Sequence, residues 1–300
     1  MKVAVVHDIP LDEEKKEMID AVVHALKSSH QVDPLPFDES FMLKVKHYDV
    51  VFNLSSSAKQ VHVPALLELL NVPYTGSDPL GHALCIDKSV TKTILKHHGI
   101  PTPQFITAKP NEKVPEIDFY PAIVKPSREG SAKGLSRDSV VHDYDSLMRA
   151  VKRVWNEFSQ PALIDEFIDG REFSVGIVDN NVLPILEIDF SSLPEGLERF
   201  YSYRVKHNYS EQTRYVCPAQ IPHGLENKIK RYALSAFKAL NLRNYARMDL
   251  RIRGKEIFFL EVNSLPLLVP EYSDITKMAK AANWSYEELV TRILNTALKF

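Results

Sequence analysis

Acidic side chains on either side of a predicted hairpin are the strongest chemical signal in this sequence. Asp249 lies in the run RMDLR, and Glu261 and Asn263 end the run IFFLEVN. Gly254 and Lys255 separate the two runs and are typical of a tight turn, so we expect neighbouring antiparallel strands. Facing residues of such strands lie about 5 Å apart. Two carboxylates and an amide oxygen would suit Mg²⁺, which completes its shell with water and nucleotide phosphates.

The alternative for this hairpin is a solvated surface with ordinary cross-strand charges. Glu261 follows the apolar residues IFFL, however, where a lone carboxylate is costly unless it is paired or bound to a metal. We therefore predict a metal site and keep the solvated hairpin as the alternative.

Lysines in two other segments could bind phosphate. Lys125 ends the apolar run AIV and precedes the polar loop 127–131, where Gly130 permits close approach of the backbone to an anion. Lys88 and Lys92 are four residues apart on one predicted helix and form a second basic site. Taken singly, Lys125 is better explained as a surface lysine before a turn, and Lys88 and Lys92 as a solvated helix face.

A third segment, DEFI at residues 165–168, is followed by GREF. An extended chain there could hydrogen-bond a purine through its backbone, while an acidic side chain takes the ribose hydroxyls. An edge strand followed by a turn is the alternative, and the sequence leaves both open.

Strands and helices alternate in the first part of the chain, which predicts βαβ units and a mainly parallel sheet. The strands are expected at residues 3–6 and 50–53, and the helices at 12–28 and 65–70. We place a domain boundary near residue 85.

The remaining elements predict an α+β unit followed by a sheet with covering helices. The expected helices are residues 86–99, 143–158, 225–240 and 285–298. The expected strands are residues 122–125, 162–168, 172–178, 182–188, 247–252 and 257–262.

Composition excludes several classes of protein. The 300 residues carry 37 basic and 39 acidic side chains, a net charge of −2, which argues against a general binder of nucleic acid or anionic membrane. No uncharged apolar run reaches about 18 residues, so we expect no membrane span. Two cysteines, Cys85 and Cys217, make neither a disulfide framework nor a zinc site. We expect a protein of the reducing cytoplasm.

These segments, in this order, resemble the ATP-grasp ligases, and among them the D-alanine–D-alanine ligases. The most specific segments are IVKPSREGS (123–131), ARMDL (246–250) and FLEVNSLP (259–266), and the resemblance covers nearly the whole chain. It implies an N-terminal α/β domain, a central lid and a C-terminal domain, with ATP held between the last two. We assign these to residues 1–85, 86–175 and 176–300.

The resemblance also implies a role for each of twelve residues. The implied ligands of ATP are Lys88, Lys125, Glu129, Glu166, Ile168 and Glu172, with Glu166 and Ile168 at the adenine and Glu172 at the ribose. The implied ligands of two Mg²⁺ ions, or of Mn²⁺, are Asp249, Glu261 and Asn263. The implied catalytic residues are Arg247, Lys206 and Ser131. Lys206 matches a lysine near the γ-phosphate, and Arg247 would stabilise charge on the reacting carboxylate.

The implied chemistry is activation of a carboxylate. A carboxylate oxygen attacks the γ-phosphate to give an acyl phosphate and ADP, and an amine then displaces the phosphate. This reaction needs no protein nucleophile; it needs positioning, charge neutralisation and a lid that excludes water.

Departures from the family pattern gather where the substrates would bind. Residues 7–10 (HDIP) and 54–60 (LSSSAKQ) stand where the family has glycine-rich segments. Leu267 replaces a glycine after the metal-binding asparagine, His207 a loop tyrosine, and Ala132 a serine.

Three hypotheses follow. The leading one is an ATP-dependent carboxylate–amine ligase that joins an amino acid or small acid to an amine. The second is a genuine D-alanine–D-alanine ligase of peptidoglycan precursor synthesis. The third is a nucleotide-binding protein that has lost ligation. The resemblance further implies small-molecule partners, neither nucleic acid nor membrane, and a homodimer.

Overall fold

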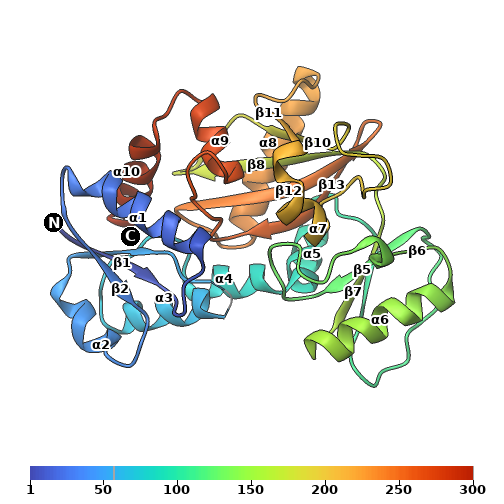
Figure 1. The fold of residues 1–300 in the computed structure, drawn as a ribbon, viewed down its shortest axis with the longest axis horizontal. Coiled ribbons are helices and arrows are strands. Elements are labelled where there is room, and N and C mark those ends of the chain that lie inside the picture. The colour runs from blue at the N-terminus through green and yellow to red at the C-terminus, as the bar shows by residue number, and fades with distance from the viewer. Residues whose placement is uncertain (57, 300) are drawn as a thin grey trace.

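The computed structural model describes residues 1–56 and 58–299 of the chain (Figure 1). Its first sheet has the order β2-β1-β3 and is parallel throughout. The strands are β1 (Lys2–His7), β2 (Gln31–Pro36) and β3 (Val50–Asn53), and α1 (Glu13–Lys27) packs against them. Asp12 caps α1 by accepting a hydrogen bond from the Lys15 amide.

The parallel sheet expected in the first part of the chain is thus confirmed. The strands β1 and β3 are apolar and buried on both faces, the pattern of a covered parallel sheet, whereas the edge strand β2 is partly exposed. The short helices α2 (Phe41–Lys44) and η1 (Val45–His47) precede β3. α3 (Lys59–Leu69) begins earlier than predicted. Ser57, within the divergent segment 54–60, lies outside the described residues.

The second sheet is antiparallel, with the order β4-β7-β5-β6. Its elements, with covering helix α6, are β4 (Phe105–Ala108), β5 (Ala122–Pro126), η2 (Arg137–Ser139), β6 (Val140–Val141), α6 (Tyr144–Phe158) and β7 (Ala162–Glu166). β7 lies inside the sheet and ends at Glu166, so the edge-strand alternative for residues 165–168 is wrong. The apolar face of α6 packs on this sheet in a core of its own.

The third sheet is also antiparallel and has the order β11-β10-β8-β12-β13, with β9 paired to β8. Its strands are β8 (Arg171–Val178), β9 (Asn181–Val182), β10 (Leu186–Asp189), β11 (Arg214–Val216), β12 (Tyr245–Arg253) and β13 (Glu256–Asn263). The predicted strand 182–188 is wrong as a single element. Pro184 interrupts it, because proline offers no N–H to a neighbouring strand.

The remaining helices connect and cover these sheets. They are α4 (Pro79–Ile86), α5 (Lys88–His97), α7 (Tyr203–Asn208), η3 (Ser210–Gln212), α8 (His223–Ala239), α9 (Asp274–Ala281) and α10 (Tyr286–Ala297). The predicted helix 86–99 starts at Lys88, because Asp87 adopts an extended backbone and caps α5 by accepting from the Ser89 amide. Figure 1 shows α4 and α5 running between the first and second sheets.

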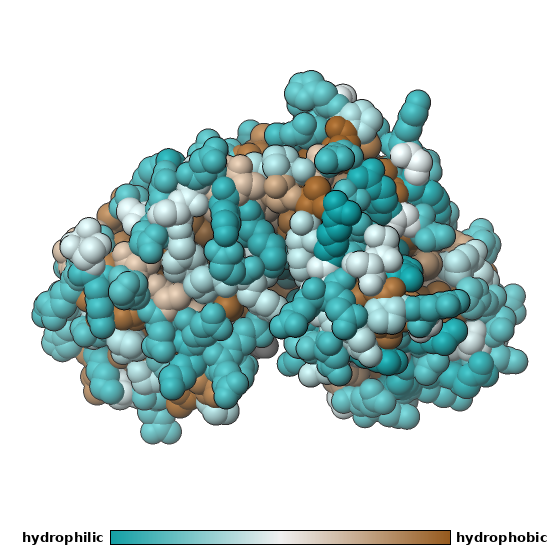
Figure 2. All heavy atoms as spheres, turned by 45° about the horizontal axis from the view of Figure 1, so that its top comes forward, coloured by the Kyte–Doolittle hydropathy of each residue, from teal (hydrophilic) through white to brown (hydrophobic). Residues whose placement is uncertain are grey.

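The first sheet and the end of the chain share one core. Side chains of β1 and α1 pack with those of α9 and α10. The surface in Figure 2 is largely hydrophilic and has a hollow between two lobes. Within residues 1–56 and 58–299, no helix is both long and apolar enough to span a membrane.

Candidate active site

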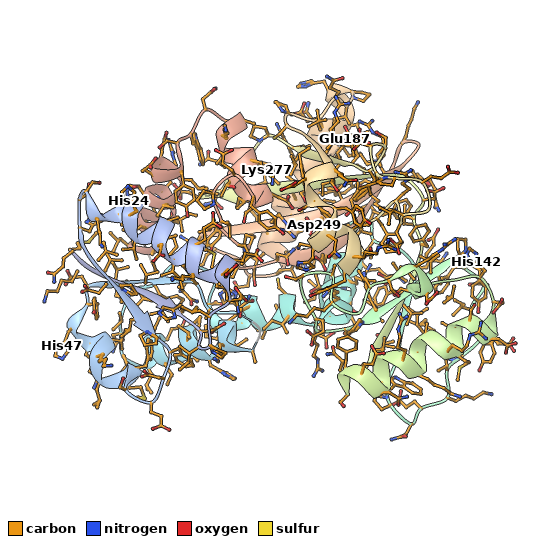
Figure 3. The ribbon with its side chains drawn as sticks, viewed as in Figure 1. His24, His47, His142, Glu187, Asp249 and Lys277 are labelled. Atoms are coloured by element: carbon orange, nitrogen blue, oxygen red, sulfur yellow. The ribbon has the colours of Figure 1, made fainter. Side chains whose placement is uncertain are left out.

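A cavity of about 520 Å³ lies among the three sheets, and all twelve predicted site residues line it. They are Lys88, Lys125, Glu129, Ser131, Glu166, Ile168, Glu172, Lys206, Arg247, Asp249, Glu261 and Asn263. Figure 3 shows Asp249 near the middle of the molecule, on the strands of the third sheet.

The β12–β13 hairpin builds the acidic part of the cavity. Asp249 pairs directly with Glu261, and Arg247 with Asn263. The Asp249 side chain is 13% exposed and that of Glu261 30%, so the alternative of a solvated hairpin is wrong. The Asn263 Nδ2 atom lies 3.2 Å from Asp249 Oδ2 and 3.4 Å from Glu261 Oε1.

Cations balance these two carboxylates. Arg247 holds Asp249 with two hydrogen bonds, Nε to Oδ1 at 2.9 Å and Nη2 to Oδ2 at 2.7 Å. Lys88 Nζ lies 3.6 Å from Glu261 Oε2. Burial raises the pKa of Glu261, but Lys88, Lys125 and Arg247 outweigh it and bring that pKa to about 2. Burial, with Glu261 close by, raises the pKa of Asp249.

Oxygen donors in this arrangement fit a divalent cation. Two carboxylates face each other across paired strands, and the Asn263 Nδ2 atom lies near both; rotation of this amide about its last side-chain bond would place its oxygen there instead. Among the described residues, no group of three or more His, Cys, Asp and Glu side chains forms a metal cluster, so the third protein donor would be Asn263. A magnesium ion needs no more, because it keeps water and phosphate oxygens in its shell.

A buried charge cluster adjoins the cavity, which Lys125 and Asp165 line. Asp165 Oδ2 is 2.8 Å from Lys125 Nζ and 3.2 Å from Lys92 Nζ. The side chains of Lys92 and Asp165 are 0% and 1% exposed. The alternatives of an exposed turn for Lys125 and a solvated helix face for Lys88 and Lys92 are therefore wrong.

Asp165 was not predicted to be the partner of these lysines. Desolvation brings the pKa of Lys92 down to about 8 despite the attraction of Asp165. For Lys125 the balance is reversed: burial lowers the pKa, but Asp165, Glu261 and Glu172 together raise it above the ordinary value. The signal in the sequence was an aspartate directly after the apolar run ALI, where a carboxylate needs a partner.

The predicted nucleotide acids carry arginine partners. Glu172 Oε2 accepts a hydrogen bond from Arg251 Nε at 2.9 Å, and Arg251 Nη1 donates to the Ile168 carbonyl at 2.8 Å. Arg253 Nη1 lies 2.7 Å from Glu166 Oε1. Sequence reasoning missed Arg251, although its spacing of two residues from Asp249 along β12 puts both on one face.

The polar loop after β5 closes over Lys88. Lys88 Nζ donates to the Glu129 carbonyl, and the Glu129 carboxylate accepts from Gln160 Nε2 at 3.0 Å. Ser131 and Ala132 both adopt left-handed backbone angles, with φ of 54° and 58°. The loop thus presents the Ser131 hydroxyl and its own backbone to the cavity.

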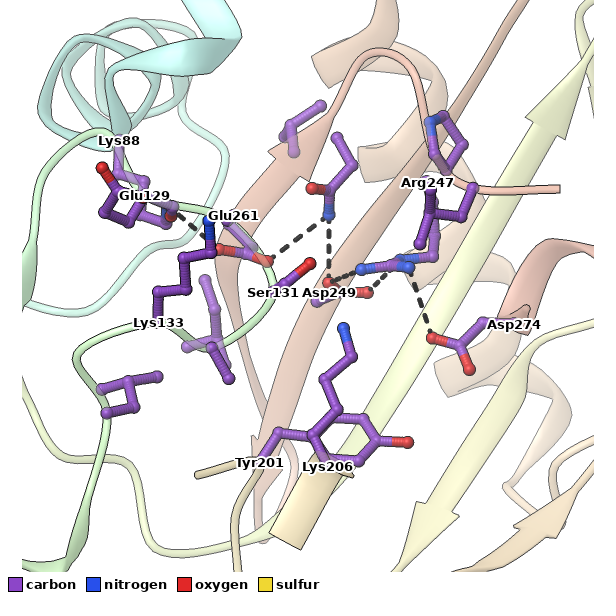
Figure 4. A pocket seen from close by; sticks show the side chains of 18 of the residues that line it. Lys88, Glu129, Ser131, Lys133, Tyr201, Lys206, Arg247, Asp249, Glu261 and Asp274 are labelled. Atoms are coloured by element: carbon purple, nitrogen blue, oxygen red, sulfur yellow. Dashed lines mark hydrogen bonds and ion pairs between the residues drawn. The ribbon is translucent and has the colours of Figure 1, made fainter. Parts of the chain in front are cut away.

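Figure 4 shows Lys206, Arg247 and Asp274 on the side of the cavity away from Lys88. Lys206 lies on α7, with its Nζ 5.8 Å from the centre of the Tyr201 ring. His207 packs beside Tyr203 at 4.3 Å between ring centres. Leu267, which the family resemblance led us to single out, also lines the cavity.

The divergent N-terminal segments contact one another. Asp8 is buried and accepts hydrogen bonds from the Ser56 amide, at 3.0 Å, and from the Ser56 hydroxyl. Lys15 and Lys59 each place Nζ 3.9 Å from the Asp8 carboxylate. Ser56 and Lys15 line the cavity. This corner is therefore polar and held by side chains.

Comparisons with known proteins agree with this geometry. The model of the family described as "D-ala D-ala ligase C-terminus" matches residues 94–295. A D-alanine–D-alanine ligase of Syntrophotalea carbinolica is 37% identical over 233 residues, which are 77% of this chain and 72% of the relative. The chain belongs to the D-alanine–D-alanine ligase family.

Other relatives of this family member extend the likeness. The uncharacterized protein y4sG of Sinorhizobium fredii is 37% identical over 254 residues, 83% of this chain and 74% of that protein. The crystal structure of a Bacillus anthracis D-alanine–D-alanine ligase complexed with ATP superposes with a TM-score of 0.83, at 25% identity, over 100% of this chain and 98% of that one.

These comparisons confirm two predictions. The fold class is the mixed α/β ATP-grasp fold, and the family is one of ATP-dependent ligases that form a carbon–nitrogen bond. The domain boundaries near residues 85 and 175 stay predictions.

Proposed function

We propose that this protein is an ATP-dependent carboxylate–amine ligase that works through an acyl phosphate, with substrates other than two D-alanines. One observation carries the proposal: the paired carboxylates of Asp249 and Glu261 share a cavity with Lys88 and Lys125. Acids that hold divalent cations and lysines that neutralise phosphates are what phosphoryl transfer to a carboxylate requires.

In this proposal the nucleotide lies between the second and third sheets. Lys88 and Lys125 contact its phosphates under the loop of Glu129. Glu166 and Ile168 lie at the adenine. Glu172 binds the ribose, and Arg251 keeps its carboxylate in place.

Asp249, Glu261 and Asn263 would hold two Mg²⁺ ions, for which Mn²⁺ could substitute. Bound there, the ions would neutralise phosphate charge and orient the reacting group. In the structure Arg247 and Lys88 balance the acidic charge. Both cations can turn to the phosphates and the reacting carboxylate when a metal ion takes their place.

Arg247, Lys206 and Ser131 act at the reacting end. Arg247 and Lys206 stabilise negative charge on the carboxylate as it attacks the γ-phosphate, and Ser131 donates a hydrogen bond from the loop. Lid closure by the second sheet would exclude water from the acyl phosphate. We further propose a cytoplasmic enzyme and a homodimer with small-molecule substrates.

Hydroxylamine trapping tests the proposal. An acid activated as an acyl phosphate gives a hydroxamate with hydroxylamine, whichever amine is the natural acceptor. We expect Mg²⁺-dependent phosphate release and hydroxamate formation with at least one acid in a panel of D- and L-amino acids and small acids. Phosphate release in the absence of hydroxamate, or no release with any acid, would contradict the proposal.

A genuine D-alanine–D-alanine ligase is the second candidate, favoured by the names of the relatives. Formation of D-alanyl-D-alanine from ATP and D-alanine, measured by mass spectrometry, separates it from the first. The substitutions at Leu267, His207 and residues 54–60 lead us to expect little or none of that product.

A further inference from the structure

Lys133 brings a cation into the cavity that the proposed function does not use. It lies in the polar loop after β5, two residues beyond Ser131, and lines the same cavity as Lys88 and Glu261. Figure 4 shows its side chain pointing into the cavity, on the side of Lys88 and Glu261 and not on that of Asp274. The loop therefore carries a cation of its own towards the acids that are proposed to hold metal ions.

The backbone on either side of Lys133 is held in place by hydrogen bonds and packing. The Leu135 carbonyl accepts a hydrogen bond from the Tyr203 amide at 2.9 Å, which ties the loop to α7, the helix of Lys206. Gly134 has a φ of 78°, and a Cβ atom there would lie 2.7 Å from Pro126 Cγ, so the loop packs closely against the end of β5. The turn thus sets the direction of an exposed lysine side chain.

The charge of Lys133 has no partner, unlike the charges of three other cations that line the cavity near this loop. Each of those three has a carboxylate beside it: Lys88 has Glu261, Lys125 has Asp165, and Arg128 has Asp87. Within residues 1–56 and 58–299, no side chain forms a hydrogen bond or an ion pair with the Lys133 ammonium. A lysine ammonium is a compact charge with three donors, and one that points into a cavity without a carboxylate beside it suits an anionic ligand.

We propose that Lys133 is a third phosphate-binding lysine, which contacts the γ-phosphate of bound MgATP and makes the site favour the triphosphate over the diphosphate. Metal ions at phosphoryl-transfer sites bridge the β- and γ-phosphates, so a cation on the side of the metal-binding acids lies at that end of the nucleotide. Lys88 and Lys125 share their charge with carboxylates, whereas Lys133 has its whole charge available for phosphate. This inference rests on the position that the proposed function gives the nucleotide, and adds a residue to it.

Calorimetric titration in the presence of Mg²⁺ tests the role of Lys133, with ADP and with the nonhydrolysable triphosphate adenylyl imidodiphosphate. In Lys133→Met we expect the affinity for the triphosphate to fall by roughly tenfold or more, the scale of one hydrogen bond between charged groups, and the affinity for ADP to change by less than about twofold. Lys133→Arg keeps the positive charge and should retain the affinity for the triphosphate to within about threefold.

Lys152→Met is the matched control, because Lys152 is an exposed lysine of α6, on the same part of the molecule, and does not line the cavity. It removes the same charge and should leave both affinities unchanged. Wild-type affinity for the triphosphate in Lys133→Met would overturn the inference. Equal losses for ADP and the triphosphate, or an equal loss in Lys152→Met, would also overturn it, because such losses would reflect the overall charge and not a contact with the γ-phosphate.

Failure of this inference and failure of the proposed function are distinguishable. Hydroxamate formation by the wild type, combined with unchanged triphosphate affinity in Lys133→Met, rejects the role of Lys133 and leaves the ligase proposal standing. No hydroxamate with any acid removes the ligase proposal, whereas the nucleotide titrations still decide the role of Lys133. A wild type that binds neither nucleotide removes both.

Discussion

Asp165 lies between two buried lysines. Its Oδ2 atom is 3.2 Å from Lys92 Nζ and 2.8 Å from Lys125 Nζ. The sequence predicted both lysines as candidates for phosphate binding, from their places in a helix and at the end of a strand. It did not predict their shared partner, because the contact joins α5, β5 and β7, which are far apart in the chain. The sequence therefore predicted the two lysines themselves, but it could not predict which residue pairs with them in the fold.

Removing this partner should destabilise the protein. Asp165→Asn leaves two buried lysines near each other without the one carboxylate that both contact, and we expect a loss of about 3 kcal/mol or more in the free energy of unfolding. Urea denaturation measures it. Asp169→Asn, at an exposed position nearby, is the control and should change stability by less than about 0.5 kcal/mol. Equal stability of the two variants would show that Asp165 is not needed to balance the lysines.

Lys92 gives a pH-dependent prediction. Its pKa of about 8 in the folded protein lies below its ordinary value of 10.5, so between these values the unfolded chain binds the proton more tightly. The contribution of Lys92 to stability therefore increases as the pH rises from about 8 towards 10.5. The free energy of unfolding is measured for the wild type and for Lys92→Met at about pH 8 and at about pH 10.5. We expect the value of the wild type, relative to that of the variant, to be higher at the higher pH. A difference that does not change with pH would contradict this prediction.

Among the elements, the β12–β13 hairpin was predicted most completely. Its turn chemistry and apolar runs predict both strands. The register set at the turn, which pairs Arg253 with Glu256, would put Leu260 opposite Asp249, and an irregularity between Asp249 and Leu250 brings Glu261 there instead, which the sequence did not predict. The helices α4, α7 and α9 were missed because each is eight residues or shorter, too short a window for helical periodicity to be distinguished. α7 and α9 bring Lys206 and Asp274 to the cavity. The part of the cavity proposed for the reacting carboxylate could therefore be predicted less well than the proposed metal site.

Gly170 tests how the segment after β7 packs on the hairpin. A Cβ atom at this position would lie 2.2 Å from the Ile252 carbonyl oxygen of β12. Gly170→Ala must therefore push the two backbones apart, and we expect it to lower stability by about 2 kcal/mol and to weaken nucleotide binding. Gly224→Ala is the matched control, because no atom lies within 4 Å of its added Cβ and its helical position favours alanine. Equal melting temperatures for both variants would refute the close approach.

At the scale of the whole molecule, the chain forms two separately packed parts around the cavity. The first sheet shares its core with α9 and α10, whereas the second sheet has a core built from its own strands and α6. The family resemblance implied three domains, at residues 1–85, 86–175 and 176–300, and did not imply that the first shares a core with the end of the chain. Burial patterns alone could not show that the two ends of the chain pack together, because that contact links residues nearly 300 positions apart.

The separate core of the second sheet leads to a prediction about which segments nucleotide binding orders. The loop after β5 reaches Lys88 across the cavity, so bound MgATP should hold the second sheet against α5. Hydrogen exchange should slow in residues 127–136 when MgATP is added and stay unchanged in β1 and β3. Equal exchange in the loop with and without MgATP, under conditions in which the nucleotide binds, would contradict this closure.

The central claim is that the acids of the β12–β13 hairpin hold divalent cations against a nucleotide triphosphate. Calorimetric titration with ATP, in the presence of Mg²⁺ and again with excess chelator, tests it most directly, using the wild type and Asp249→Asn. We expect binding to the wild type that depends on Mg²⁺ and is strongly weakened in Asp249→Asn, while both proteins remain folded by circular dichroism. No binding of MgATP to the wild type, or equal affinity in the variant, would contradict it.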